Sequence, residues 1–402
     1  MERLTRNRWM IWLFYFHLVA VLSLGTFYIG GASLRVYSTL IMTILVLITG
    51  NSLSFYKDKY ICLYVAFQLA MMLALSINGE LTEYGFFKKF LAYHYVGIVT
   101  YYAIQRFVIS ERVLWYSMIV LLLLVSVDAV ISILQYYGNS TAWSIGVLLG
   151  DDSDKMERLD VFDTMLGVSA VPGVFQNVVK NAYQLAVFAP IACLLVEQKR
   201  SVLMRLFAIC AIVLIIYASF VTQQRAAFGL VLICMFVFLV RLSVKHKVRG
   251  RLAVLLVIVI GLILADHIQA DDMGRLIETG NDTREVLKEQ AVSFIDDNWA
   301  FGAPMRFQRI AGLSAHNFIY DTIIFSGILG FLIMMVLTIT MAYNSLHNIR
   351  KSFSNYAPLF YVSLMVVVAL IYGLFHNTSL LTGEVAIIIV LAYMVRLHHM
   401  KM

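Results

Sequence analysis

Apolar stretches long enough to cross a lipid bilayer recur along the whole of this 402-residue chain. A membrane-spanning helix takes roughly 20 mainly apolar residues. The stretches are continuous, whereas the strands of an outer-membrane barrel alternate apolar and polar residues over about ten positions. The pattern therefore predicts an all-α polytopic membrane protein with about twelve transmembrane helices, and we expect residues 1–402 to form a single integral membrane domain. The predicted spans are 9–29, 33–50, 60–77, 90–109, 113–137, 176–196, 202–220, 226–243, 251–269, 316–343, 357–376 and 383–397.

The composition excludes a soluble enzyme. Hydrophobic residues make up 61% of the chain and charged residues 14%, whereas a soluble domain carries about 25% charged residues. The four cysteines all fall inside apolar stretches, so we interpret them as packing residues. Their spacing indicates neither a disulfide framework nor a metal site. We expect no metal and no cofactor.

The charged residues are distributed unevenly between the predicted loops. In every loop that would be cytoplasmic if the amino terminus is inside, Lys and Arg outnumber Asp and Glu. This asymmetry is typical of cytoplasmic loops, and it predicts that both termini face the cytoplasm. The net charge of +7 therefore reflects topology, and no nucleic-acid partner is expected.

Two predicted outer loops are long, at residues 138–175 and 270–315. The first contains an acidic cluster between Asp151 and Asp163. The second indicates an amphipathic helix, with Val286 and Ile295 among its apolar residues, followed by the segment Trp299–Pro304. Long loops with structure of their own usually carry function, so we expect the active site on the outer face.

Arg225 follows Thr222-Gln-Gln in a short hairpin between two predicted spans. An arginine near hydrocarbon is costly unless it is paired, so an anion or a carboxylate should lie beside it. The alternative is an arginine that extends its charge to the membrane interface. Arg284 lies where Asn281, Asp282 or Thr283 could begin the outer-loop helix, and there it could hold an anion. Its alternative is a solvated charge or a pair within the helix.

His316 opens the tenth predicted span at the outer surface, where an ordinary pKa near 6.5 suits it to accept a proton. The alternative is an interface histidine at a helix end. Asp321 is five residues further on, about 140° around a helix, which disfavours a His-Asp pair. His376 and Asn377 repeat the His-Asn dipeptide at the outer end of the eleventh span.

Two further features lie inside predicted spans. Asp128 is an acid within the fifth span, where it is either functional or neutralised by protonation or by a neighbouring helix. Gly327 and Gly330 indicate close helix packing in the tenth span.

Several stretches together resemble the O-antigen ligase and O-antigen polymerase superfamily of bacterial membrane glycosyltransferases. The matching segments lie in order between about residues 170 and 335. They are Gly173–Asn181, Thr222–Ala226, Thr283-Arg284 leading to Trp299–Gly302, Ala315–Phe318 and Ser326–Gly330. Gln224 departs from the Ser or Thr that many members carry at that position.

The resemblance implies a GT-C-like, metal-independent, inverting glycosyltransferase in the bacterial inner membrane. Such an enzyme transfers glycan from undecaprenyl diphosphate to a sugar hydroxyl at the periplasmic face. It implies that Arg225 and Arg284 bind the diphosphate and that His316 acts as the base. The residues expected to contact substrate are Asn177, Lys180, Asn181, Gln224, Asn317 and His376.

Two members of the superfamily differ in their acceptor. A polymerase uses a second lipid-linked glycan, and a ligase uses the lipid A core, which is commonly phosphorylated. The net negative outer face would repel that core, which favours a polymerase, although the Thr-Gln-Gln-Arg hairpin also resembles ligases. A chain-length regulator is a further candidate partner. A lipid-linked oligosaccharide flippase is the alternative from another class, but it would require charges and broken helices at mid-membrane.

Overall fold

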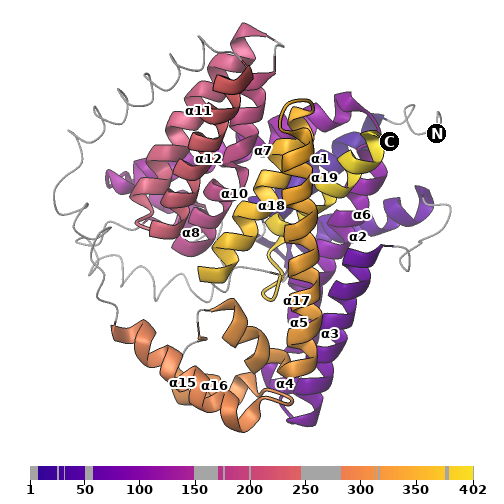
Figure 1. Ribbon diagram of the computed structural model, residues 1–402, viewed down its shortest axis with the longest axis vertical. Coiled ribbons are helices and arrows are strands. Elements are labelled where there is room, and N and C mark those ends of the chain that lie inside the picture. The colour runs from indigo at the N-terminus through magenta and orange to yellow at the C-terminus, as the bar shows by residue number, and fades with distance from the viewer. Residues whose placement is uncertain are drawn as a thin grey trace.

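The computed structural model describes residues 8–24, 27–30, 32–49, 58–148, 171–174, 177–198, 201–245, 282–312, 314–315, 317–375 and 380–401. Almost all of this structure is helical (Figure 1). The first half contains α1 (Arg8–Leu22), α2 (Leu34–Thr49), α3 (Lys59–Ile77), α4 (Leu81–Tyr84), α5 (Phe86–Lys89), a π-helix η2 (Phe90–Tyr95), α6 (Val96–Phe107), α7 (Glu111–Tyr136) and α8 (Ser140–Leu148). A short antiparallel hairpin, β1 (Tyr28–Ile29) and β2 (Ala32–Ser33), joins α1 to α2.

The second half continues the bundle and adds two helices at one end of it. It contains α10 (Val178–Glu197), α11 (Val202–Val221), α12 (Arg225–Lys245), α15 (Asp282–Asn298), α16 (Pro304–Ala311), α17 (Phe318–Ser352), α18 (Ala357–Phe375) and α19 (Val385–Lys401). α3 and α17 pack against each other along one side, and α15 and α16 lie beyond the end of the bundle (Figure 1).

The all-α membrane architecture is confirmed. Among the described residues, seven helices are long and apolar enough to cross a membrane: α3, α7, α10, α11, α12, α17 and α18. Three shorter apolar helices, Arg8–Leu22, Leu34–Thr49 and Val385–Met400, coincide with predicted spans. The ninth predicted span, 251–269, lies outside the described residues. The count of twelve therefore stays a prediction.

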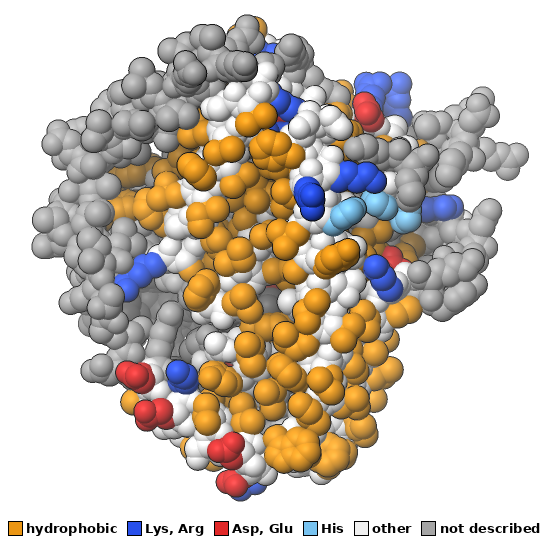
Figure 2. Space-filling model, in the orientation of Figure 1, with side chains coloured by type: hydrophobic (Ala, Val, Ile, Leu, Met, Phe, Trp, Pro, Cys, Tyr) orange, Lys and Arg blue, Asp and Glu red, His pale blue; other side chains and the backbone are white. Residues whose placement is uncertain are grey.

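The bundle is organised around α10 and α18. The most apolar stretch of α10 is 83% buried and that of α18 72%, against 28% for α11. Helices at the periphery of the bundle instead expose apolar side chains, including Ile48 of α2, Phe236 of α12 and Leu332 of α17. Figure 2 shows hydrophobic side chains covering the middle of one face. Lipid tails solvate such a surface, which water would not.

A buried ion pair ties three helices together at one end of the bundle, which we call the Glu197 end. The Arg241 side chain on α12 is fully buried, and its Nε donates to Glu197 Oε2 of α10 at 2.7 Å. Glu197 also accepts from Lys245 Nζ at 2.6 Å and from the Tyr361 hydroxyl of α18 at 2.8 Å.

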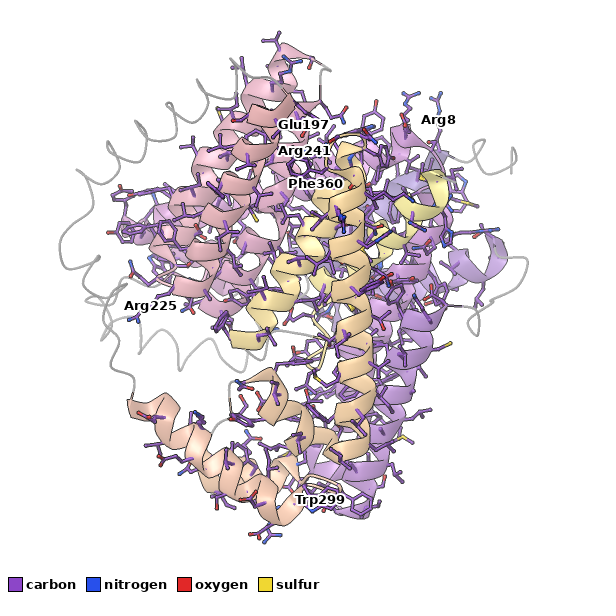
Figure 3. All side chains as sticks on the ribbon, viewed as in Figure 1. Arg8, Glu197, Arg225, Arg241, Trp299 and Phe360 are labelled. Carbon is purple, nitrogen blue, oxygen red and sulfur yellow. The ribbon has the colours of Figure 1, made fainter. Side chains whose placement is uncertain are left out.

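Arg225 lies at the opposite end of α12, which we call the Arg225 end (Figure 3). The outer helices α15 and α16 lie beyond this end of the bundle, with Trp299 at their far side (Figure 3). Leu287, Ala291 and Phe294 form the buried face of α15, whereas Val286 is 51% exposed. Val286, one of the apolar residues that indicated this helix, therefore lies outside its buried face.

α17 is interrupted at Gly327, where its backbone approaches the segment between α15 and α16. Gly327 has φ 61° and ψ −170°, which interrupts the helix. A Cβ at this position would overlap the backbone carbonyl oxygen of Ala300. At Gly327 the backbone of α17 thus lies close to the backbone of Ala300, whereas the sequence indicated only close helix packing. Gly330 does face α3, because its Cβ would lie 3.6 Å from Ala70 Cβ.

Candidate functional site

The Thr222–Gln224 hairpin is tight and strained. α11 ends at Val221 and α12 begins at Arg225, so three residues reverse the chain. Gln223 has φ 55°, an uncommon value for a residue other than glycine. Its amide atoms are buried and have no hydrogen-bond partner within the described residues. Strain of this kind is enriched at functional sites. Arg225 itself is exposed, in line with a charge that reaches the end of the bundle.

Two of the asparagines expected to bind substrate cap helices. Asn177 accepts hydrogen bonds from Val179 N and Lys180 N at the start of α10. Asn317 accepts from Ile319 N and Tyr320 N at the start of α17. Capping accounts for the asparagine at both positions, and substrate contact stays a prediction.

Asn181 and Asp128 belong to a buried polar cage around the segment Val171–Val174. Asp128 Oδ1 accepts from Val174 N at 2.9 Å. Asn181 Nδ2 donates to Ser132 Oγ at 2.9 Å and to the Val171 carbonyl at 3.2 Å. Two acceptors in the cage, Asp128 Oδ2 and Asn181 Oδ1, are buried without a partner among the described residues. Asp128 therefore fixes a loop to α7, a role that the sequence did not predict.

A small pocket lies where α1, α2, η2, α10 and α19 meet, at the Arg225 end of α10. We call it the Arg35 pocket, and its volume is about 80 Å³. Lys180 Nζ lies 3.3 Å from Glu384 Oε1, and these side chains are 39% and 12% exposed. The polar residues and the glycine that line it are Ser23, Arg35, Tyr93, Lys180, Gln184, Gly383 and Glu384.

The Tyr93 ring is in contact with both cations of the pocket. The Arg35 guanidinium carbon is 4.8 Å from the Tyr93 ring centroid, and Lys180 Nζ is 5.6 Å from it. Both distances are typical of cation–π contacts. Tyr93 belongs to the π-helix η2, and single π-turns inside α-helices are frequent at functional sites.

The same π-helix places His94 behind the pocket. His94 Nδ1 lies 2.6 Å from the Tyr64 hydroxyl and 3.1 Å from Gln68 Nε2. Gly383 packs directly on this helix, because a Cβ there would lie 2.8 Å from Tyr93 Cβ and 3.0 Å from His94 Nδ1. These contacts explain why a histidine interrupts the fourth predicted span.

Asp321 fixes the backbone on both sides of position 316. Its carboxylate accepts from Ala315 N at 2.8 Å and from Asn317 N at 3.2 Å. The aspartate is fully buried. His316 and His376 lie outside the described residues, and so does the side chain of Arg284. Their predicted roles therefore stay predictions.

The outer helices are anchored to the bundle by a second carboxylate. Glu80 accepts from Met305 N at 3.0 Å and from Arg306 N at 2.9 Å in the first turn of α16. Nearby, Lys89 Nζ lies 3.7 Å from the Tyr84 ring centroid. Burial lowers the pKa of the Lys89 ammonium and raises the pKa of Tyr84 to about 12.

A larger cavity, about 560 Å³, lies at the Glu197 end and is lined by Glu111, Lys245 and Tyr356, among others. The cation in its wall, Lys245, is already paired with Glu197. The Arg35 pocket combines two cations and an acid with a glycine in the left-handed region, so it is the better candidate for a polar ligand. Among the described residues, no group of three His, Cys, Asp or Glu side chains could hold a metal ion.

No protein-family model matches the sequence, and no curated protein matches it either.

The sequence did not single out Arg35, Tyr93 or Glu384. One signal was present for Arg35, because it is a basic residue at the predicted outer end of the second span, 33–50, and Arg225 is likewise a basic residue on that side. The residues that complete the pocket come from helices far apart in the chain. Nothing in the spacing of a single sequence predicts that they meet.

Proposed function

We propose that the protein is a membrane glycosyltransferase that transfers glycan from undecaprenyl diphosphate to a sugar hydroxyl at the outer membrane face. One observation carries the proposal: stretches that resemble the O-antigen enzymes gather at one end of the bundle. Lys180 lies in the first turn of α10, Arg225 begins α12, and Asn317 caps the start of α17 beside the outer helices. Glu197 and Arg241 mark the other end (Figure 3).

The proposed reaction is a direct displacement at the anomeric carbon. The bond from that carbon to the diphosphate oxygen breaks while the bond to the acceptor oxygen forms, and the configuration inverts. The acceptor proton passes to His316, and the diphosphate leaves with its negative charge. Fixed cations such as Arg225 and Arg284 stabilise that charge best in a site that excludes water.

The polymerase is the favoured member of the superfamily, and the ligase is the alternative. Deletion of the gene, followed by electrophoresis of the surface polysaccharide, separates them. One repeat unit on the core indicates a polymerase, and a bare core indicates a ligase. Lipid-linked repeats held at the cytoplasmic face would instead indicate a flippase and contradict the proposal.

The site residues are tested by complementation of the deletion strain. Arg225→Ala, Arg284→Ala and His316→Ala should each abolish glycan transfer while the protein stays in the membrane. Arg112→Ala is the matched control, because Arg112 is exposed at the start of α7 and lies outside the matching stretches. A normal polysaccharide ladder with the His316 variant would contradict its role as the base.

A further inference from the structure

Among the described residues, Arg35 has no anionic partner in the pocket. Its Nε is buried and has no hydrogen-bond partner in the part of the chain that the structure describes. The described ion pairs give Lys180 an acid but give Arg35 none. Burying a guanidinium nitrogen without an acceptor costs free energy. The contact with the Tyr93 ring offsets part of that cost, but it supplies no hydrogen-bond acceptor.

The pocket therefore has an excess of positive charge. Arg35 and Lys180 lie against the same Tyr93 ring, and Glu384 is the acid among the lining residues. Glu384 already pairs with Lys180. Two cations that line one partly desolvated pocket repel each other, and a bound anion reduces that repulsion.

The volume and the donors restrict which anion fits. A drug-sized ligand needs roughly 300 Å³ or more, whereas this pocket offers about 80 Å³. That is space for one tetrahedral oxyanion and not for a sugar ring. The guanidinium can bind two oxygens of such a group at once, and a lysine adds a point charge. Gln184 supplies a neutral amide beside them.

We propose that the Arg35 pocket binds one phosphate group through Arg35 and Lys180. The source of that phosphate rests on the proposed function, which would supply it as part of a lipid-linked diphosphate. The binding itself does not rest on that function, because the charges and the volume belong to the described residues alone.

The test measures binding of inorganic pyrophosphate to the purified full-length protein in detergent, by titration calorimetry at constant ionic strength. Arg35→Gln and Lys180→Met should each weaken binding by at least about tenfold, as expected for loss of a charge-assisted hydrogen bond. Arg112→Gln is the matched control and should leave binding unchanged. Arg112 also lies over a tyrosine, 5.6 Å from the Tyr116 ring centroid, but it is exposed and outside the pocket.

Glu384→Gln should have the opposite effect and tighten pyrophosphate binding, because it removes the acid that competes for Lys180. A misfolded variant would not bind more tightly, so this result separates the proposal from a loss of structure. Unchanged affinity in folded Arg35→Gln and Lys180→Met variants would overturn the proposal, and so would weaker binding in Glu384→Gln.

The source of the phosphate is resolved by repeating the titration with a short-chain polyprenyl diphosphate. If the lipid binds more tightly than pyrophosphate and Arg35→Gln weakens both, the pocket receives a lipid-linked phosphate. If the two ligands bind equally, the pocket recognises the free anion. Either result is compatible with the proposed phosphate site. A normal glycan ladder from a folded Arg35→Gln strain would separate this site from glycan transfer.

Discussion

Arg241 and Glu197 form a buried ion pair between α12 and α10, with 2.7 Å between Arg241 Nε and Glu197 Oε2. Arg241 Nη1 also donates to the carbonyl oxygens of Ser352 and Phe353, beyond the end of α17. The guanidinium lies 4.3 Å from the Phe360 ring centroid. One side chain thus connects α10, α12, α17 and α18, and we expect the stability of the bundle to depend on it.

Removing one partner of this pair should destabilise the protein strongly. Arg241→Met leaves Glu197 with one cation fewer in a buried site, and such a change costs about 3–5 kcal/mol. Chemical unfolding in mixed micelles measures the change. The double variant Arg241→Met with Glu197→Gln should lose less than the sum of the single variants, because it removes both charges of the Arg241–Glu197 pair together. Additive losses would contradict the coupling.

Asp128 should tolerate an amide but not an apolar side chain. In Asp128→Asn the amide oxygen can still accept from Val174 N, and the new N–H₂ group can donate in a cage that holds the unpaired Asn181 Oδ1. We expect this variant to unfold at the same temperature as the unmodified protein or higher. Asp128→Leu leaves Val174 N without its acceptor and should lose about 1–3 kcal/mol. Equal destabilisation of both variants in thermal unfolding would mean that the carboxylate charge itself is required.

Gly327 and Gly229 should respond in opposite directions to the same substitution. Gly327→Ala places a Cβ against the Ala300 carbonyl at a backbone angle that other residues avoid, and we expect a loss of at least about 1–3 kcal/mol. Gly229 lies inside α12 with nothing within 4 Å of an added Cβ. Gly229→Ala should therefore stabilise the helix, by up to about 1 kcal/mol. Thermal unfolding of both variants checks the pair, and a stable Gly327→Ala protein would contradict the close approach.

Asp321→Ala should loosen the backbone around position 316. The change leaves the amide groups of Ala315 and Asn317 without acceptors, so their hydrogen exchange should accelerate. Under the proposed function, glycan transfer should fall as well. Glu83→Gln is the control, because the exposed pair of Glu83 with Arg309, at 3.5 Å, contributes little. Unchanged exchange in Asp321→Ala would contradict the anchoring role.

The helices were predictable because apolar stretches and caps are local signals. The third predicted span, 60–77, matches Lys59–Ile77, whose start is fixed by the Asp58 cap. The eleventh, 357–376, matches Ala357–Phe375. The break at Gly327 was not predictable, because its cause is the backbone of Ala300, which is distant in the chain.

The candidate site was less predictable for the same physical reason. The distribution of charge between loops indicates which arginines lie on the outer side. It does not indicate which of them is buried in the folded bundle. Arg225 is exposed, whereas Arg35 has a buried Nε with no hydrogen-bond partner among the described residues. The difference arises from which helices pack around each residue, and that packing is a property of the assembled bundle.

The two cations of the Arg35 pocket are carried by helices that are anchored in different ways. α10 is clamped at its far end through Glu197 and near the pocket through Asn181. Lys180 is therefore carried by a helix with little freedom to shift. Arg35 instead follows a four-residue hairpin ladder between α1 and α2. In the proposed phosphate site, Lys180 would therefore hold its position through α10, and Arg35 would hold its position through the first turn of α2.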